Sequence, residues 1–232
     1  MPLDGAIIGE GIYTPREAAR LIGGTPQQVL RWTRGSGASD PIWKAHYQFL
    51  DDTTEVSFID LIELRVVRGL LKLGASLQAI RYAIGVAKNK FGIDRPLSSV
   101  AFQIDGREIL MDAIERDGEL VSLSRQRPGQ KVFRDIVAQS VSGLEYDGSQ
   151  VARWRPIIAK HVVIDPKRSF GDPIVDEIGV STSTLYKEWM SRPNFRKIAA
   201  LYEVKELLVR DAVKFEKALT LMVSEKRGQG LI

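Results

Sequence analysis

The sequence contains no cysteine and only two histidines among its 232 residues. Disulfide bonds, thiolate zinc sites and cysteine nucleophiles are therefore excluded. No apolar run approaches the roughly 20 residues that a membrane-spanning helix needs, and the N-terminus lacks the basic and then apolar layout of a secretion signal. We expect a cytoplasmic protein without membrane contact, metal or cofactor.

Catalytic motifs are scarce as well. The run from Gly9 to Gly11 does not continue into a phosphate-binding fingerprint, and no Walker motif occurs. His46 and His161 stand apart from each other, and each is more typical of a surface or hydrogen-bonded residue than of a catalytic base. The sequence therefore favours a binding protein over an enzyme.

What is present is an ordinary folded composition with an uneven charge. Hydrophobic residues make up 44% of the chain and charged residues 27%, and the length suits two or three domains. The net charge is +4, with a balance of +2 in residues 1–95, −3 in residues 96–150 and +5 in residues 151–232. Basic ends favour a polyanionic partner, because neutralising phosphates and releasing their counterions drives nucleic-acid affinity.

Two capped helices are predicted near the N-terminus. The segment Thr14–Glu17 (TPRE) is a capping box with proline at the first helical position, and Gly23 suits the left-handed exit of that helix. The segment Thr25–Gln28 (TPQQ) repeats the device and opens a second helix that runs to Arg34. Two short helices joined by a glycine turn predict a helix-turn-helix, whose second helix reads base edges with its first residues.

Residue types on the second helix suit DNA. Gln27 and Gln28 carry amide groups that can pair with adenine, while Arg31 and Arg34 share a face and suit phosphate or guanine. Trp32 suits either the core or a contact beside a sugar and phosphate. The alternative for this segment is a helical hairpin with a solvated polar face.

The residues that follow indicate a wing and two more helices. Residues 35–56 are predicted to form a β-hairpin with an acidic turn. Ser57 is predicted to cap a helix that ends at Gly74, and Ser76 to cap the next one. The order of these features, with Leu30-Arg31-Trp32, Phe58–Leu61 (FIDL) and Leu73–Arg81 (LGASLQAIR), resembles the MerR-type winged helix domain.

The resemblance implies contacts with operator DNA. It places Arg31 and Trp32 at phosphates, Arg16 at a helix start and Lys44 on the wing. The expected DNA-binding residues are Arg16, Thr25, Gln27, Gln28, Arg31, Trp32, Arg34 and Lys44. Because no long coiled coil follows residue 91 and no cysteine is present, we expect a homodimer formed through another surface and no metal-sensing or redox-sensing activator.

The middle of the chain is predicted to be a small mixed region. The prediction is a hairpin of Ala101–Ile104 and Arg107–Met111 around Asp105-Gly106, a further strand at Leu120–Leu123, and a helix from Val132 that ends near Gly143. The region is rich in carboxylates, namely Asp112, Glu115, Asp117 and Glu119. A solvated charged face is the preferred interpretation, and a metal site or acid–base pair is the alternative.

The C-terminal third is predicted to form a short strand and three helices. The strand is His161–Ile164, followed by a Gly- and Pro-rich connection at Phe170–Val175. Helices are expected from Thr182 to Met190, from Asn194 onward, and after a tight turn at Tyr202-Glu203. This order predicts a tri-helical helix-turn-helix domain.

The motifs of this third resemble a second known family. Those motifs are His161–Pro166 (HVVIDP), Phe170–Val175 (FGDPIV), Ile198–Tyr202 (IAALY) and Ala212–Glu216 (AVKFE). They resemble an uncharacterised prokaryotic domain whose members sit beside genes for PIN-like ribonucleases and are grouped with antitoxins. A MerR-like domain ahead of it resembles the VapB-type antitoxins of mycobacterial toxin–antitoxin pairs. The two resemblances cover roughly residues 12–92 and 157–219.

The last residues are a candidate toxin-binding tail. In antitoxins of this type, a C-terminal extension often covers the toxin, and a basic side chain can reach the acidic nuclease pocket. The candidates are Leu221, Met222, Lys226, Arg227 and Leu231, with Arg227 as the first choice for the basic group. The alternative is a frayed chain end.

These expectations combine into an α+β, mainly helical protein. We predict a MerR-like winged helix domain at 1–95, a small α/β middle region at 96–156, a tri-helical antitoxin-associated domain at 157–219 and a flexible tail at 220–232. The expected function is an antitoxin that neutralises a PIN-like ribonuclease and represses its own operon. The alternatives are a regulator of other genes, whose C-terminal module reads DNA or dimerises, and a metal-dependent hydrolase that uses the middle carboxylates.

Overall fold

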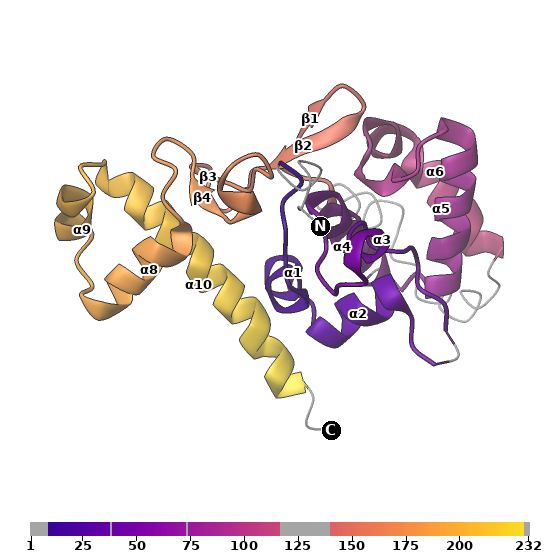
Figure 1. Ribbon diagram of the computed structural model, residues 1–232, viewed down its shortest axis with the longest axis horizontal. Helices are drawn as coiled ribbons and strands as arrows, with labels where there is room; N and C mark the ends of the chain where they lie inside the picture. The colour runs from indigo at the N-terminus through magenta and orange to yellow at the C-terminus, as the bar shows by residue number, and fades with distance from the viewer. Residues whose placement is uncertain (1–8, 38, 73, 117–139, 230–232) are drawn as a thin grey trace.

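A computed structural model describes residues 9–37, 39–72, 74–116 and 140–229. Figure 1 shows two lobes, one built from α1 to α6 with the hairpin β1–β2, and one built from the sheet β3–β4 with α8 and α9. The helix α10 starts in the second lobe and crosses to the first. Among the residues described, no helix combines the length and apolar character that crossing a bilayer requires.

The first two helices were correctly predicted. They are α1 (Pro15–Ile22) and α2 (Pro26–Arg34), and each begins with a reciprocal capping box. In α1 the backbone N–H of Thr14 donates to Glu17 Oε2 over 2.8 Å, and the N–H of Glu17 donates back to Thr14 Oγ1 over 3.3 Å. Gly23 ends α1 at φ +70°, the left-handed conformation that favours glycine.

The predicted β-hairpin wing is wrong for the described residues of 35–56. They form a short helix, α3 (Gln48–Asp51), and isolated bridges only, such as Ser36–Ser39. The reason is burial, because Trp43 and Tyr47 are 8% and 2% exposed and turn into the core. The Tyr47 hydroxyl also donates to the carbonyl of Gly11 over 2.5 Å, which folds the segment onto the lobe instead of extending it.

The next two helices are confirmed as α4 (Phe58–Lys72) and α5 (Leu77–Phe91). The hydroxyl of Ser57 accepts the N–H of Asp60 over 3.2 Å, and the hydroxyl of Ser76 accepts the N–H of Ala79 over 3.0 Å. Both serines therefore cap the helices that the sequence assigned to them.

The hairpin predicted at 101–111 is wrong, because this stretch belongs to one helix. After the 3₁₀ turn η1 (Pro96–Ser98), α6 runs over Val100–Arg116. Phe102, Ile109 and Ala113 are buried at helical spacing, and α6 packs along α5. The strand predicted at 120–123 and most of the helix predicted from 132 lie outside the described residues. Ser140 is helical, and a turn follows it to Gly143.

Two small antiparallel sheets follow. The hairpin β1 (Leu144–Asp147) and β2 (Gln150–Trp154) was not predicted, although Asp147-Gly148 is a hairpin signal. The predicted strand at 161–164 is confirmed as β3 (Val162–Val163), which pairs with β4 (Ile174–Val175) across the 3₁₀ turn η4 (Ser169–Gly171). The described structure is thus mainly helical with a small β component, as expected.

The three C-terminal helices lie where they were predicted. They are α8 (Thr182–Ser191), α9 (Phe195–Leu201) and α10 (Glu206–Gln229). Asn194 caps α9, and its side chain accepts the N–H of Lys197 over 3.0 Å. The predicted flexible tail is corrected in one respect, since α10 continues without a break from Glu206 through Gln229.

Two hydrophobic cores hold the fold together. The larger one gathers residues from Tyr13 to Ile164, and it also contains Phe215 and Leu219 of α10. The smaller one contains Val175 and the inner faces of α8, α9 and the first half of α10. The helix α10 is therefore the one element that contributes to both cores among the described residues.

Candidate nucleic-acid interface

Four of the predicted DNA-binding residues lie on the open surface. Gln27 and Arg31 are exposed on α2, Arg16 is exposed on α1, and Lys44 is exposed on the segment before α3. Within the described part of the chain, their side chains make no hydrogen bond or ion pair. Their donors are therefore available to an external ligand such as a phosphate or a base edge.

Two further predicted residues are occupied by the cap of α2. The Thr25 hydroxyl accepts the N–H of Gln28 over 3.2 Å, and Gln28 Oε1 accepts the N–H of Thr25 over 3.0 Å. Gln28 keeps its side-chain NH₂ for an outside contact. Both residues mainly fix the start of α2.

Trp32 and Arg34 support α2 from behind. Trp32 is 3% exposed and belongs to the larger core, so burial assigns it to packing. Arg34 forms an ion pair of 2.7 Å with Asp52 Oδ1 and donates to the carbonyl of Thr53 over 2.9 Å. It therefore joins the end of α2 to the segment that follows α3.

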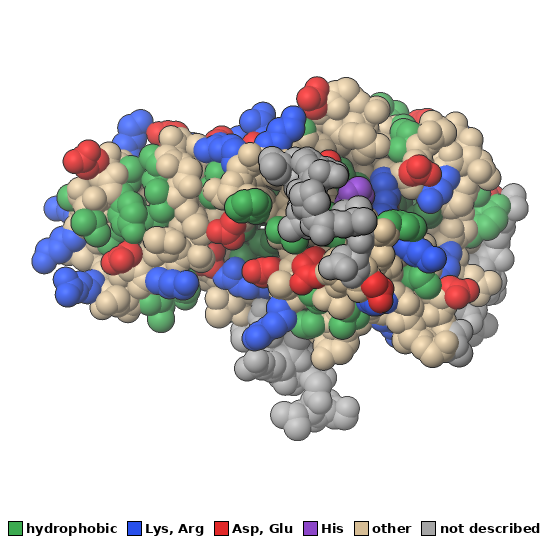
Figure 2. All heavy atoms as spheres, viewed as in Figure 1, with side chains coloured by type: hydrophobic (Ala, Val, Ile, Leu, Met, Phe, Trp, Pro, Cys, Tyr) green, Lys and Arg blue, Asp and Glu red, His purple; other side chains and the backbone are tan. Residues whose placement is uncertain are grey.

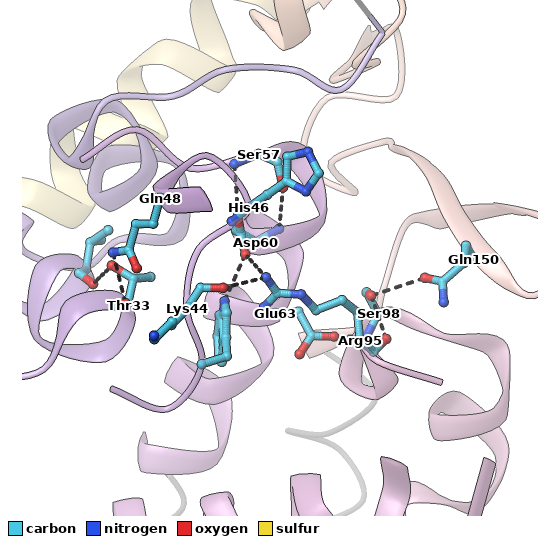
Figure 3. A network of polar contacts seen from close by, with 12 residues as sticks. Thr33, Lys44, His46, Gln48, Ser57, Asp60, Glu63, Arg95, Ser98 and Gln150 are labelled. Atoms are coloured by element: carbon cyan, nitrogen blue, oxygen red, sulfur yellow. Dashed lines mark hydrogen bonds and ion pairs between the residues drawn. The ribbon is translucent and has the colours of Figure 1, made fainter. Parts of the chain in front are cut away.

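A buried polar network that the sequence did not reveal fixes the backbone next to Lys44 (Figure 3). Asp60 is fully buried and accepts the indole N–H of Trp43 over 2.8 Å and the backbone N–H of His46 over 2.9 Å. Arg95 Nη2 lies 2.9 Å from Asp60 Oδ1 and donates to the carbonyl of Lys44 over 2.8 Å. The backbone at Lys44 is thus held in place by this network.

A second buried carboxylate extends this network. Glu63 is 1% exposed, and its Oε1 accepts the backbone N–H of Ser98 over 2.8 Å. Burial raises the pKa of Glu63 to about 7, against the opposing effects of the Arg95 charge and the Ser98 hydrogen bonds. Glu63 therefore ties η1 to α4.

The candidate toxin-binding residues lie on the last turns of α10. Leu221 and Met222 are 62% and 44% exposed. Lys226 and Arg227 belong to the helical backbone of α10, while Leu231 lies outside the described residues. Met222 lies against the turn between α1 and α2, since a Cβ atom on Gly23 would stand 3.4 Å from Met222 Sδ.

A polar link joins the two lobes at the same place. Glu216 is 1% exposed, pairs with Arg20 of α1, and accepts the Thr182 hydroxyl of α8 over 2.5 Å. Nearby, the Tyr13 hydroxyl donates to the carbonyl of Gly171 over 2.8 Å. Residues about 200 positions apart form this link, so no local pattern could have indicated it.

The middle carboxylates do not assemble into a site within the described residues. Asp112 is exposed on α6, the side chain of Glu115 is not described, and Asp117 and Glu119 lie outside the described residues. In the described ranges, no group of three or more His, Cys, Asp or Glu side chains could hold a metal ion.

The chain is similar to a known protein and to a solved structure. No family model matches the chain. The chain is 25% identical over 221 residues to a Mycobacterium tuberculosis protein named "Putative antitoxin VapB45", covering 87% of this chain and 92% of that protein. It also matches the crystal structure of Rv2018 from Mycobacterium tuberculosis with a TM-score of 0.69 and 26% identity, covering 87% of this chain and 96% of that chain. The chain is thus similar, over most of its length, to a protein named as a putative antitoxin.

Proposed function

We propose that this protein is an antitoxin that binds and neutralises a PIN-like ribonuclease toxin and represses its own operon. The observation that carries the proposal is the similarity to VapB45, which extends over 87% of the chain and so includes both lobes. The two activities are assigned to different parts of the sequence, and each rests on its own set of residues.

The DNA-binding activity is assigned to a MerR-like module around α1 and α2. Gln27 lies in the first turn of α2, where a helix-turn-helix presents its residues to base edges. Arg31 follows one turn later, and Arg16 and Lys44 flank the pair with cations suited to phosphates. Gln28 contributes through its free NH₂ group, while Thr25 and Arg34 position the helix.

The toxin-binding activity is assigned to the last turns of α10 and the residues beyond. Leu221 and Met222 offer neighbouring exposed apolar side chains that a partner could cover. Lys226 and Arg227 supply positive charge for the acidic pocket of a metal-dependent nuclease, and Leu231 adds a further apolar group. The chain acts as a homodimer in this proposal, so that one dimer can occupy two operator half-sites.

Toxin binding is tested by co-expression with the product of the adjacent gene. The intact chain should co-purify with that product and suppress its RNA cleavage. A chain truncated after Met222 keeps the contact with Gly23 and the Glu216 pair, so it should stay folded but lose suppression. Suppression by the truncated chain at the level of the intact one would remove the tail from the toxin interface.

DNA binding is tested on the DNA upstream of the chain's own gene. Gln27→Ala combined with Arg31→Ala should weaken binding about 100-fold, because one good base contact contributes roughly tenfold or more. Lys187→Ala on α8 is the matched control, since Lys187 is equally exposed but lies in the other lobe. An unchanged affinity in the double variant would move DNA recognition away from α2.

One observation favours a second candidate, a regulator of other genes that reads DNA with its C-terminal lobe. Lys and Arg side chains are spread over the outer edge of this lobe (Figure 2). The exposed cations of this lobe without an ion pair in the described ranges include Lys187, Arg192, Lys197, Lys205 and Lys214. Specific DNA binding that survives the α2 double variant but not neutralisation of these cations would favour this candidate.

A further inference from the structure

Three aromatic rings lie next to one another in the C-terminal lobe. Tyr186 and Trp189 are three residues apart on α8, so they share a face of that helix, and Phe195 is the first residue of α9. The ring centroids of Tyr186 and Trp189 are 6.1 Å apart and those of Trp189 and Phe195 are 6.0 Å apart, with interplanar angles of 15° and 22°. We call these three nearly parallel rings the aromatic row.

The aromatic row has an inner side in the core and an outer side in solvent. All three side chains pack against the smaller core, yet each keeps part of its surface exposed. This sets Trp189 apart from the other three tryptophans of the chain, which are between 3% and 8% exposed. Figure 2 shows hydrophobic side chains on the surface of this lobe, with Lys and Arg around its outer edge. The row is therefore fixed from behind and accessible to a ligand from outside.

Cations adjoin the aromatic row. Lys217 Nζ lies 3.9 Å from the Trp189 ring centroid, and this lysine makes no ion pair among the described residues. Arg210 lies 4.4 Å from the ring centroid of Phe195 and also pairs with a glutamate of its own helix. Residues 182–220 contain eight Lys and Arg against five Asp and Glu, and three of the five acidic side chains are already paired. The surface around the row is thus positively charged.

The contact of Lys217 with Trp189 does not close the row to a ligand. A cation–π contact at an exposed site is weak, and the lysine side chain is flexible. A flat aromatic ligand can therefore take the place of the ammonium group over the indole ring. The ammonium group can then pair with an anionic part of the same ligand.

Nearly parallel rings beside cations suit a single-stranded nucleic acid. In proteins that bind such strands, bases stack on aromatic side chains while cations follow the phosphates. A duplex cannot use the row in this way, because its bases are stacked inside the helix and present only their edges in the grooves. An acidic protein surface would use the cations but has no need of the ring faces.

We propose that the aromatic row and Lys217 bind single-stranded RNA, with a base stacked on Trp189 and a phosphate at Lys217. The choice of RNA over single-stranded DNA rests on the proposed function, since the partner of a ribonuclease meets RNA. The site lies in the other lobe from α2 (Figure 1). RNA binding is therefore an activity in addition to the binding of operator DNA and toxin.

The stacking contact is tested by titrating the full chain with a labelled oligouridylate of about 12 nucleotides, a length within the site sizes of stacking surfaces. Trp189→Leu keeps an apolar side chain but removes the ring, so it should weaken binding about tenfold, the effect of roughly one lost base stack. Trp189→Tyr keeps a ring and should keep most of the affinity. RNA should quench the tryptophan fluorescence of the wild type but not that of Trp189→Tyr, because the other tryptophans are buried.

The phosphate contact is tested with Lys217→Gln. The slope of log affinity against log salt should become shallower by about 0.7, the value for one phosphate of a single strand. Lys90→Gln is the matched control, because Lys90 also adjoins a ring, 5.6 Å from the Phe91 centroid, but lies in the first lobe. This control should leave both the affinity and the slope unchanged.

Several outcomes would overturn the inference. They are no binding of the oligouridylate, full affinity in Trp189→Leu, an equal loss in Lys90→Gln, or equal affinity for an oligothymidylate DNA of the same length. A loss of RNA binding in Gln27→Ala with Arg31→Ala would overturn it as well, by moving the contact to α2. Quenching of Trp189 by the toxin without any binding of RNA would assign the row to a protein partner instead.

Failure of this inference can be told apart from failure of the proposed function. Toxin and duplex binding are measured separately, so a negative result with RNA leaves both of them standing. A chain that binds the oligouridylate through Trp189 but binds neither the toxin nor the upstream duplex would overturn the proposed function and leave the aromatic row as an RNA site.

Discussion

The two segments that the sequence predicts to be helix-turn-helix units are built in different ways. In the first, α1 and α2 each begin with a reciprocal capping box, and a glycine in the left-handed conformation separates them. In the second, Ser181 makes no capping bond to α8, and the non-glycine residue Glu203 takes φ +55° in the turn before α10. Both helices of the first segment thus carry a local N-cap, whereas in the second segment α9 is capped by Asn194 but α8 depends on what packs around it.

The surroundings of the second segment supply what its local sequence lacks. The rings of Tyr186, Trp189 and Phe195 stack with centroids 6.1 and 6.0 Å apart. Lys217 lies 3.9 Å from the Trp189 ring centroid, and Arg210 lies 4.4 Å from that of Phe195. Apart from the Tyr186–Trp189 stack within α8, these contacts join different helices and hold the lobe together, so the two segments should respond differently to substitution.

The largest effect is expected from Glu216→Ala, which cuts the link between the segments. The change leaves Thr182 without its acceptor and Arg20 without its partner, and removing one member of a buried pair costs about 3 kcal/mol or more of unfolding free energy. Because the Arg20 side chain is 38% exposed, water recovers part of that cost. Urea denaturation measures it against Lys214→Ala as control, and a loss below about 1 kcal/mol would contradict the link.

The next largest effect is a pH dependence of the unfolding free energy, which arises from Glu63 in the first lobe. Because burial raises the pKa of Glu63 from 4.5 to about 7 in the folded state, protonated Glu63 stabilises the fold below pH 4.5. This contribution is lost as the pH rises towards 7, and the shift corresponds to about 3 kcal/mol.

Glu63→Gln should remove this dependence and raise the free energy of unfolding at pH 8 relative to the wild type. Urea denaturation of both proteins at intervals between pH 4.5 and 8 measures it. Parallel curves for the two proteins would show that Glu63 does not titrate in that window.

Substitutions in the turns of the two segments should change the stability of the protein in opposite directions. Gly23→Ala places a Cβ in the left-handed region and 3.4 Å from Met222 Sδ, so it should cost about 1 kcal/mol. Glu203→Gly relieves the same conformation and should stabilise by about 0.5 kcal/mol, after the entropy cost of glycine. Thermal unfolding of both variants gives the signs, and equal signs would contradict the difference between the turns.

The smallest expected difference in stability is between substitutions at the N-cap positions of α2 and α8. Thr25→Ala removes the acceptor for the N–H of Gln28 and should cost about 1 kcal/mol. Ser181→Ala loses no capping bond to α8 and should cost less than about 0.5 kcal/mol. Chemical denaturation of the pair resolves this, and an equal loss would contradict the difference between the caps.

Sequence reasoning succeeded where a helix carries its own boundary signals. The capping residues Thr14, Thr25, Ser57 and Ser76 each stand at the start of a helix in the structure. It failed at Asp105-Gly106, which was interpreted as a hairpin turn but lies inside α6. A Cβ on Gly106 would come within 2.6 Å of the Phe102 ring, so the glycine serves close packing.

The same dipeptide at Asp147-Gly148 does form a hairpin turn, and it was overlooked. Gly148 has φ +61° there, between β1 and β2. The dipeptide alone therefore does not decide the structure. The flanking pattern decides, since Phe102, Ile109 and Ala113 are buried at helical spacing around the first copy.

The candidate interface was predictable in its residue types but not in its exposure. Gln27 and Arg31 are open to solvent as their helix positions indicated, whereas Trp32 is packed away and Arg34 is paired. Arg34, at the end of α2, is not free because Asp52 and Thr53, about 20 residues later in the sequence, fold back against it. The Asp60–Arg95 pair spans about twice that gap, so neither pair could be predicted from spacing.

The position of α10 has a consequence for synthesis of the chain. The larger core includes both Tyr13 and Leu219, so its packing is incomplete until Leu219 has left the ribosome. Contacts of such high sequence separation form slowly, because a long loop must close first. During that delay the apolar surface that Phe215 and Leu219 will cover stays open to solvent. A ribosome that stops before residue 215 would release a chain in which α1 and α2 can form but part of the core behind them is uncovered.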